Sequence, residues 1–269
     1  MQNVRDILER VERQHPLVHC ITNPISINQC ANAVLAVGAR PIMAEHPKEV
    51  REITQTSDAL MLNLGNITDA RMASMQISAL AAKEKHIPIL LDAVGVACSK
   101  LRRDYAFELM QTVMPSIIKG NYSEINALYH TSYRSSGVDA DVSLNEQTLD
   151  RVTVELARAN HAIILASGKV DIFTDGNRLV HINNGTPRLS SVTGTGCMLG
   201  ALAASFLSVK SDINAAVVAC LVLGICGQLS ETKQGAGSFM VNLMDALSTV
   251  KDKDIEQYMD MEEISIEGF

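Results

Sequence analysis

Short apolar runs alternate with helical segments through the first half of the chain, and this alternation constrains the fold more than any other feature. The expected strands are 17–21, 40–43, 59–63, 88–92 and 117–119, and the helices between them include 27–37, a segment that starts at 46–47, and 68–85. The strand segments are continuously apolar, which is typical of strands that helices bury on both faces. We therefore predict an α/β fold with a mostly parallel central sheet and helices on both faces.

The pattern changes in the second half, where strands follow one another without intervening helices. After an expected helix at 146–160 come apolar runs at 162–166, 170–174 and 179–182, with Asp175 and Gly176 in the turn between the last two. Such short connections predict an antiparallel hairpin at one edge of the sheet. Three further helices are expected at 195–209, 212–232 and 237–250, and the polar segment 129–145 is expected to be an exposed connection.

The composition favours a single domain that acts on small molecules. The 269 residues are 47% hydrophobic, and no linker, repeat or low-complexity tract divides them, so we expect one domain over residues 1–269. A formal net charge of −7 and only 4% aromatic residues argue against a nucleic-acid surface. The sequence contains no run of about 18 apolar residues and no leader-like apolar segment, so we expect a cytoplasmic protein without a membrane span.

The cysteines and histidines do not indicate a structural metal site. The six cysteines are scattered without a C-x-x-C pair, which gives no sign of disulfides or zinc. His15, His19 and Cys20 are close in sequence, but Pro16 interrupts the segment and neighbouring strand residues point to opposite faces. A metal site built from these three residues is therefore disfavoured.

A glycine-rich loop precedes the first of the three late helices. Gly194 and Gly196 flank a threonine, Cys197 follows, and a run rich in Ala, Leu and Gly then continues to about residue 204. Backbone N–H groups at such a helix N-terminus bind anions, and beside a nucleophile-class side chain they suit a reaction that develops negative charge. A tight turn that merely permits close packing is the alternative.

Polar side chains stand at the ends of several expected strands. Asn23, Asp92, Lys119 and Ser167 each end or follow such a strand, and Glu124 opens the next helix. In open α/β sheets this edge is where ligands bind. Two carboxylates and a lysine near a glycine loop are a plausible cradle for a magnesium-bound polyphosphate, because Mg²⁺ keeps its waters and takes one or two carboxylates. The alternatives are a turn-forming asparagine before Pro24 and a first-turn helix acid at position 124.

Five segments resemble, in order and spacing, the hydroxyethylthiazole kinase family of thiamine biosynthesis and salvage. They are His19-Cys-Ile-Thr-Asn23-Pro, Gly38-Ala-Arg-Pro-Ile-Met43-Ala, Leu91-Asp92-x-Val-Gly95, Lys119-Gly-Asn-x-Ser-Glu124 and Thr193-Gly-Thr-Gly-Cys197. The last is the most specific, because the wider ribokinase-like group usually has aspartate where this family has cysteine. The resemblance implies a ribokinase-like fold, a homotrimer with active sites between subunits, and transfer of the ATP γ-phosphoryl to 4-methyl-5-(2-hydroxyethyl)thiazole with Mg²⁺.

The resemblance also implies roles for individual residues. By position, the resemblance assigns Met43 to the thiazole contact, Gly194 to the substrate site and anion hole, and Asn23, as a candidate, to the substrate pocket. It assigns Lys119 and Ser167 to contacts with ATP, and Asp92 and Glu124 to the Mg²⁺ region. Cys197 is then the catalytic base. Three departures stand out. Ala93 replaces a common proline, Lys119 a common arginine, and Tyr122 a usual small residue. Lysine keeps the charge but loses the bidentate fork, so its phosphate contact is expected to be looser.

The sequence leaves three other functions as alternatives. A related kinase of another vitamin precursor, such as a hydroxymethylpyrimidine, is disfavoured by the pocket residues Asn23 and Met43. A dinucleotide-binding oxidoreductase would use Gly194, Gly196 and Asp212, but the segment before Gly194 is a poor core strand and Asp212 starts a helix. A non-catalytic paralogue that keeps thiazole binding is the third alternative.

Overall fold

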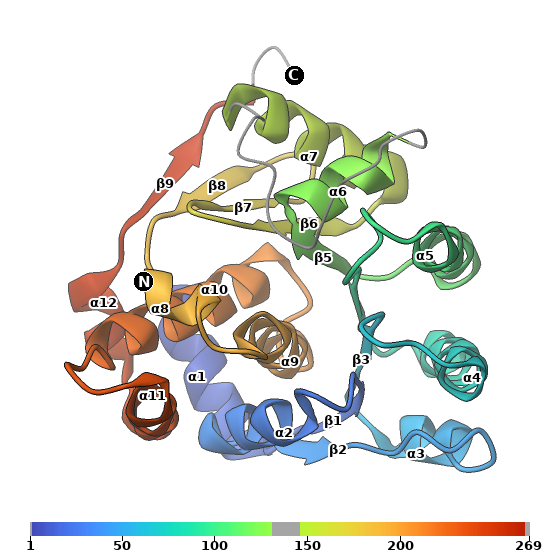
Figure 1. Ribbon diagram of the computed structural model, residues 1–269, viewed down its shortest axis with the longest axis horizontal. Coiled ribbons are helices and arrows are strands. Elements are labelled where there is room, and N and C mark those ends of the chain that lie inside the picture. Colours follow the sequence, from blue (N-terminus) through green and yellow to red (C-terminus); the bar gives the residue numbers. More distant parts are fainter. Residues whose placement is uncertain (1, 131–145, 267–269) are drawn as a thin grey trace.

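A nine-stranded sheet runs through the part of the chain that the computed structural model describes, residues 2–130 and 146–266 (Figure 1). Its strand order is β2-β1-β3-β4-β5-β6-β7-β8-β9. The strands are β1 Leu17–Ile21, β2 Arg40–Ile42, β3 Ala59–Asn63, β4 Ile89–Asp92, β5 Ile117–Asn121, β6 Ile163–Ser167, β7 Asp171–Thr174, β8 Leu179–Ile182 and β9 Met261–Ile264. Strands β1 to β6 pair in parallel, so the predicted α/β class with a mostly parallel sheet is confirmed.

Helices cover both faces of this sheet. Figure 1 shows α3, α4 and α5 on one side and α1, α2, α9, α10 and α11 on the other. The helices are α1 Gln2–Gln14, α2 Ile27–Ala36, α3 Val50–Thr56, α4 Asp69–Lys85, α5 Lys100–Val113, α6 Tyr122–Tyr129, α7 Glu146–Asn160, α8 Pro187–Ser190, α9 Thr195–Leu207, α10 Ile213–Leu229, α11 Ala236–Thr249 and α12 Asp252–Tyr258. The continuously apolar strands are explained by this arrangement, because each face of the sheet needs apolar side chains.

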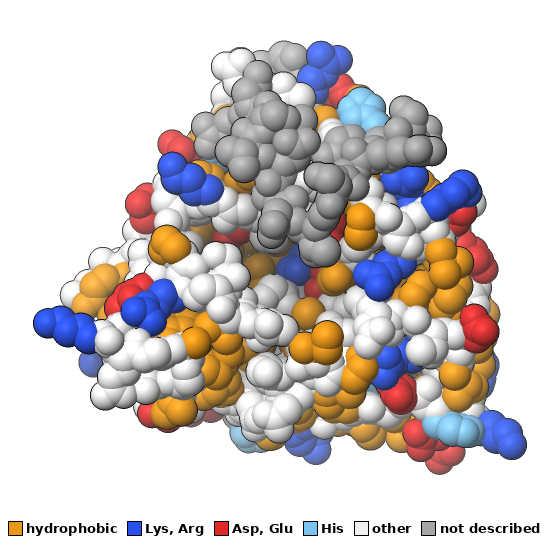
Figure 2. Space-filling view, viewed as in Figure 1, with side chains coloured by type: hydrophobic (Ala, Val, Ile, Leu, Met, Phe, Trp, Pro, Cys, Tyr) orange, Lys and Arg blue, Asp and Glu red, His pale blue; other side chains and the backbone are white. Residues whose placement is uncertain are grey.

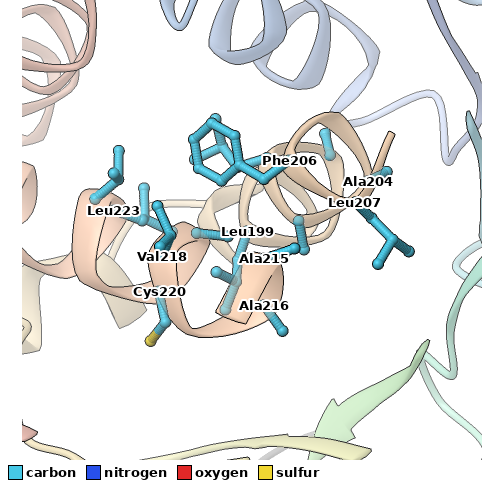
Figure 3. Close-up of a cluster of buried hydrophobic side chains, with 14 of the residues drawn as sticks. Leu199, Ala204, Phe206, Leu207, Ala215, Ala216, Val218, Cys220 and Leu223 are labelled. Carbon is cyan, nitrogen blue, oxygen red and sulfur yellow. The ribbon is translucent and has the colours of Figure 1, made fainter. Parts of the chain in front are cut away.

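Two hydrophobic cores lie on opposite faces, and alternate residues of one strand enter different cores. On β3, Met61 joins one core and its neighbours Leu60 and Leu62 join the other. The first core is built around α9 and α10, whose packed side chains are drawn in Figure 3. Gly200 of α9 lies so close to the sheet that a Cβ there would be 2.7 Å from Met61 Cε. Small residues in α9 therefore allow this helix to approach the strand ends closely.

The two helices predicted to start at residues 68 and 212 each begin with a capping side chain. Thr68 accepts from the Arg71 N–H at the start of α4, and Asp212 accepts from the Asn214 N–H at the start of α10. The prediction that a helix starts at 46–47 is wrong. The Glu49 N–H bonds to the His46 carbonyl in a turn, and α3 begins only at Val50.

The predicted antiparallel hairpin is confirmed, and the chain extends it by a strand that was not predicted. Strands β6, β7 and β8 pair antiparallel, and β9 then pairs with β8. Across that last pair, Arg178 Nε lies 2.9 Å from Glu263 Oε1. The expected connection 129–145 falls, apart from the end of α6 and His130, outside the described residues. Within the described ranges, no helix is long and apolar enough to cross a membrane.

His19 in β1 has a structural role. Its Nδ1 lies 2.8 Å from Thr54 Oγ1 of α3, and its Nε2 lies 2.9 Å from the Ala44 carbonyl oxygen. The Ala44 carbonyl can only accept, so His19 Nε2–H donates to it, while the Thr54 hydroxyl also donates to the Val50 carbonyl at 2.7 Å. Burial lowers the pKa of His19, although the bond to Ala44 opposes this effect. Among the residues described, there is no group of three His, Cys, Asp or Glu side chains that could hold a metal ion.

We predict that His19 makes the fold less stable as the pH falls. Because the folded-state pKa is depressed, only the unfolded chain takes up the proton near its ordinary value of about 6.5, so stability declines from pH 7 to pH 5 by at most about 1.4 kcal/mol per pH unit. His19→Gln should flatten that decline in urea unfolding. His86→Asn, at an exposed helix end, is the control and should leave the slope unchanged. Equal slopes for the parent and His19→Gln would contradict this role.

Candidate active site

The carboxyl ends of three neighbouring strands place polar side chains in one row. In the strand pairing, Asn63 of β3 lies opposite Asp92 of β4, and Asp92 lies opposite Lys119 of β5. Lys119 Nζ is 2.9 Å from Asp92 Oδ1, and both side chains are buried. Burial disfavours the ammonium form of Lys119, but its acidic neighbours, with Asp92 the largest contributor, together outweigh this effect and raise the pKa of Lys119. The row therefore contains a charged lysine held by a carboxylate.

Asn63 is a site residue that the sequence analysis missed. Its Nδ2 donates to Asp92 Oδ2 at 2.8 Å and to Cys197 Sγ at 3.3 Å, and its Oδ1 accepts from the Gly65 N–H at 2.9 Å. Its position at the end of an expected apolar strand could have marked Asn63 as a site residue, because the same position marks Asp92. Asn63 connects the ion pair at the strand ends with the thiol on α9.

The predicted glycine loop does precede a helix. Gly194 has φ +96 and stands at the N-cap position of α9, and its carbonyl accepts from the Met198 N–H at 2.8 Å. Only glycine adopts this backbone conformation without strain. Cys197 lies in the first turn of α9 and is half-buried. The first N–H groups of a helix have no partner within the helix, so this turn offers donors to an anion.

Glu124 has a structural role that its position in the helix explains. Its Oε2 accepts from the Asn121 N–H at 2.7 Å while the Glu124 N–H donates to Asn121 Oδ1 at 2.9 Å, which is a capping box at the start of α6. Its Oε1 accepts from the Gly95 N–H at 2.6 Å. Burial raises the pKa of Glu124, and these two N–H donors oppose the rise. Glu124 thus fastens the loop after β4 to the end of β5.

Ser167 is the last residue of β6, and the loop that follows it is fixed by the unusual Tyr122. Ser167 lies opposite Asn121 in the strand pairing. The Tyr122 hydroxyl donates to the Val170 carbonyl and accepts from the Val170 N–H at 3.2 Å. A Cβ added to Gly168 would lie 2.2 Å from the Tyr122 ring. The departure at position 122 therefore produces a contact that covers this loop.

The departure at position 93 adds a hydrogen bond beside the ion pair. The Ala93 N–H donates to the Lys119 carbonyl oxygen at 2.8 Å, one residue beyond the end of β4. A proline has no N–H and could not make this bond. Alanine at position 93 therefore adds one backbone hydrogen bond between the segment after β4 and β5, next to the site.

The structure brings most, but not all, of the candidate residues into direct contact. Asn23 Nδ2 donates to Cys197 Sγ at 3.2 Å, and the chain of contacts continues through Asn63 and Asp92 to Lys119. Met43 is half-buried on the segment after β2, where it packs on the core around α9. The next residue, Ala44, is the one held by His19. A hollow between α9 and β5 is visible near the middle of the face in Figure 2.

The comparisons with known proteins agree with this fold. A ribokinase-like superfamily protein from Enterococcus faecalis has a TM-score of 0.64 over 90% of this chain and 93% of its own, at 14% identity, so the fold is of the ribokinase-like class. The family model for the hydroxyethylthiazole kinase family matches residues 8–253, and the chain belongs to that family.

Two relatives are similar along nearly their full length. "Hydroxyethylthiazole kinase 2" of Clostridium botulinum strain Hall is 45% identical over 251 residues, which cover 91% of this chain and 95% of the relative. The structure of a hydroxyethylthiazole kinase protein from Pyrococcus horikoshii OT3 has a TM-score of 0.90 at 33% identity, over 98% of this chain and all of that one. The resemblance seen in the sequence is confirmed, and so is the ribokinase-like fold.

We predict that Lys119→Met destabilises the fold by about 3–5 kcal/mol, because it leaves the Asp92 carboxylate buried without its partner ion. Urea unfolding measures the loss, and the double variant Asp92→Asn with Lys119→Met should recover most of it. Lys100→Met is a matched control, since its pair with Asp104 is exposed and should cost less than about 1 kcal/mol. Losses of similar size at both lysines would show that burial of the pair does not matter.

Proposed function

We propose that this chain transfers the γ-phosphoryl group of ATP to the hydroxyl of 4-methyl-5-(2-hydroxyethyl)thiazole, a step of thiamine biosynthesis. The observation that carries the proposal is the Cys197 thiol in the first turn of α9, linked through Asn63 to the Asp92–Lys119 pair. The edge of the sheet then brings together a proton acceptor, the N–H donors of a helix N-terminus and a paired lysine. Phosphoryl transfer to an alcohol requires groups of these kinds, which accept the hydroxyl proton and stabilise negative charge.

Cys197 acts as the proton acceptor in this proposal. As the substrate oxygen forms its bond to the γ-phosphorus, the O–H bond breaks and the proton passes to Cys197 Sγ, while the β–γ bridging oxygen leaves with ADP. The N–H groups that follow Gly194 stabilise the charge on the transferring group. Positioning and charge stabilisation dominate such reactions, so the base contributes less than the anion site does.

The carboxylates fit a magnesium ion that binds through its waters. Asp92 and Glu124 are hard oxygen donors at the same sheet edge, and each oxygen that already accepts one hydrogen bond keeps a second lone pair. Mg²⁺ typically keeps several waters and takes one or two carboxylates together with substrate phosphates. Bound there, it would neutralise charge on the β- and γ-phosphates.

The remaining candidate residues are assigned to substrate and nucleotide contacts. Lys119 and Ser167 would contact ATP, and Met43, Asn23 and Gly194 would line the thiazole site. Lys119 is already bound to Asp92, so a phosphate must compete with that carboxylate for it. Tyr122 supports the nucleotide side by fixing the loop that follows Ser167.

The proposed enzyme is a cytoplasmic homotrimer with sites between subunits. Ile25, two residues from Asn23, is 63% exposed, and Leu35 of α2 and Val241 of α11 are 55% and 60% exposed. Figure 2 shows hydrophobic side chains gathered over α2 and α11. Such a patch beside the site supports contact with a second copy that completes the pocket. Both cores pack on one sheet, which supports a single kinase domain over residues 1–269.

A substrate panel tests the activity. The purified protein is incubated with ATP and Mg²⁺ and with the thiazole alcohol, hydroxymethylpyrimidine or simple sugars, and we expect phosphate transfer to the thiazole alcohol. Cys197→Ala should lose about 10²–10⁴-fold in kcat, and Cys197→Asp should keep much of it because a carboxylate accepts the same proton. Phosphorylation of another panel member, or parental turnover by Cys197→Ala, would refute the substrate or the base, respectively.

Light scattering tests the assembly. We expect a trimer for the parent, and Leu35→Glu should dissociate it and lower activity, since a charge would be buried in the contact. Leu101→Glu is the matched control, because Leu101 of α5 is similarly exposed at 59% on the opposite side of the sheet. A monomer that keeps full activity on dilution would rule out shared sites.

A further inference from the structure

Two asparagine side chains converge on the sulfur of Cys197. Asn23 Nδ2 lies 3.2 Å from Sγ and Asn63 Nδ2 lies 3.3 Å from it. Both asparagines are buried, Asn63 completely. Asn23 follows β1, Asn63 ends the neighbouring strand β3, and Cys197 starts α9, so three separate segments of the chain are needed to make this cluster.

The backbone fixes which end of the Asn23 amide faces the sulfur. Asn23 Oδ1 accepts from the N–H groups of Ile25 at 3.1 Å and Ser26 at 3.2 Å. A backbone N–H can only donate, so the amide oxygen must face this turn. The amide nitrogen is therefore left to face Cys197.

Asn63 is oriented just as firmly, by one donor and one acceptor. Its Oδ1 accepts from the Gly65 N–H, and its Nδ2 donates to the Asp92 carboxylate. A reversed amide would lose both bonds and bring two oxygens together. Gly65 itself lies so close that a Cβ there would be 2.8 Å from Asn63 Oδ1 and 3.0 Å from Asn23 Nδ2. Both amides thus present N–H groups to the sulfur by necessity.

We propose that Asn23 and Asn63 hold the Cys197 sulfur as a hydrogen-bond acceptor and so favour its thiolate form, with Asn63 as a positioning residue that ties this sulfur to Asp92. This inference rests on the proposed function, because it explains how Cys197 can take the hydroxyl proton. Two N–H donors stabilise an anionic sulfur much more than a neutral thiol, which is only a weak acceptor. The shared amide of Asn63 also fixes the distance between the proton acceptor and the carboxylate.

Alkylation of the free protein tests the inference without any substrate. The rate at which iodoacetamide modifies Cys197 is measured by peptide mass spectrometry relative to exposed Cys98 in the same sample. Asn23→Asp keeps the oxygen that accepts from Ile25 and Ser26 but has no N–H for the sulfur. We expect the Cys197-to-Cys98 ratio to fall about tenfold or more, since a hydrogen bond to a charged group is worth at least about that factor.

The control is Asn66→Asp, which makes the same change at an exposed position three residues beyond Asn63 and should leave the ratio unchanged. Urea unfolding confirms that each variant is folded. A folded Asn23→Asp protein with the parental ratio would overturn the inference. If the ratio falls but the parent does not phosphorylate the thiazole alcohol, the role of the amides stands and the proposed function fails.

A double-mutant cycle tests whether Asn63 acts through the sulfur. Asn63→Ala should lower kcat about tenfold and change the KM of the thiazole alcohol by less than about twofold. In a Cys197→Ala background the same substitution should have a much smaller effect on kcat, because the sulfur is already absent. Equal effects in the two backgrounds would refute the role of Asn63. If Asn63→Ala does not fold, the alkylation of Asn23→Asp decides alone.

Discussion

The buried pair of Asp92 and Lys119 is the interaction on which the rest of the site depends. Two charges are removed from water at the ends of β4 and β5, and such a pair is tolerated only when its remaining hydrogen-bonding capacity is used. Asn63 meets this need on the carboxylate side. The Ala93 N–H and Glu124 then fix the two strand ends that hold the charges. Local order around the site thus follows from the cost of burying one ion pair.

The sequence predicted the elements of this arrangement well, because the strands of a parallel sheet are marked by continuous apolar runs. The bounds of β1, β3 and α7 match their predictions. Strand β9 was not predicted, since Met261-Glu-Glu-Ile264 is acidic and its glutamates are exposed. This strand forms because it pairs with β8, and not because of its own composition. The paired residues are far apart in the chain, by 79 residues at the closest pair, Ile182 and Met261.

The site was predicted as a set of residues at one sheet edge, but not as a network. Asp92 and Lys119 were expected in one cradle, yet their direct pairing depends on which strands are neighbours and in what alignment. Asn63 was overlooked because a lone asparagine at a strand end is also typical of an ordinary turn. The resemblance to a known family supplied a role for Met43 that no local pattern could indicate, and a contact with ATP for Ser167, which the pattern placed only at a strand end.

The contact between Tyr122 and Gly168 has a consequence for how relatives of this chain can vary. The tyrosine ring fills the space that any side chain at position 168 would need, and its hydroxyl is held on both sides by Val170. The two positions therefore cannot change independently. A lineage that acquires a side chain at position 168 must first lose the aromatic ring at position 122. Among relatives, we therefore expect substitutions at these two positions to occur together.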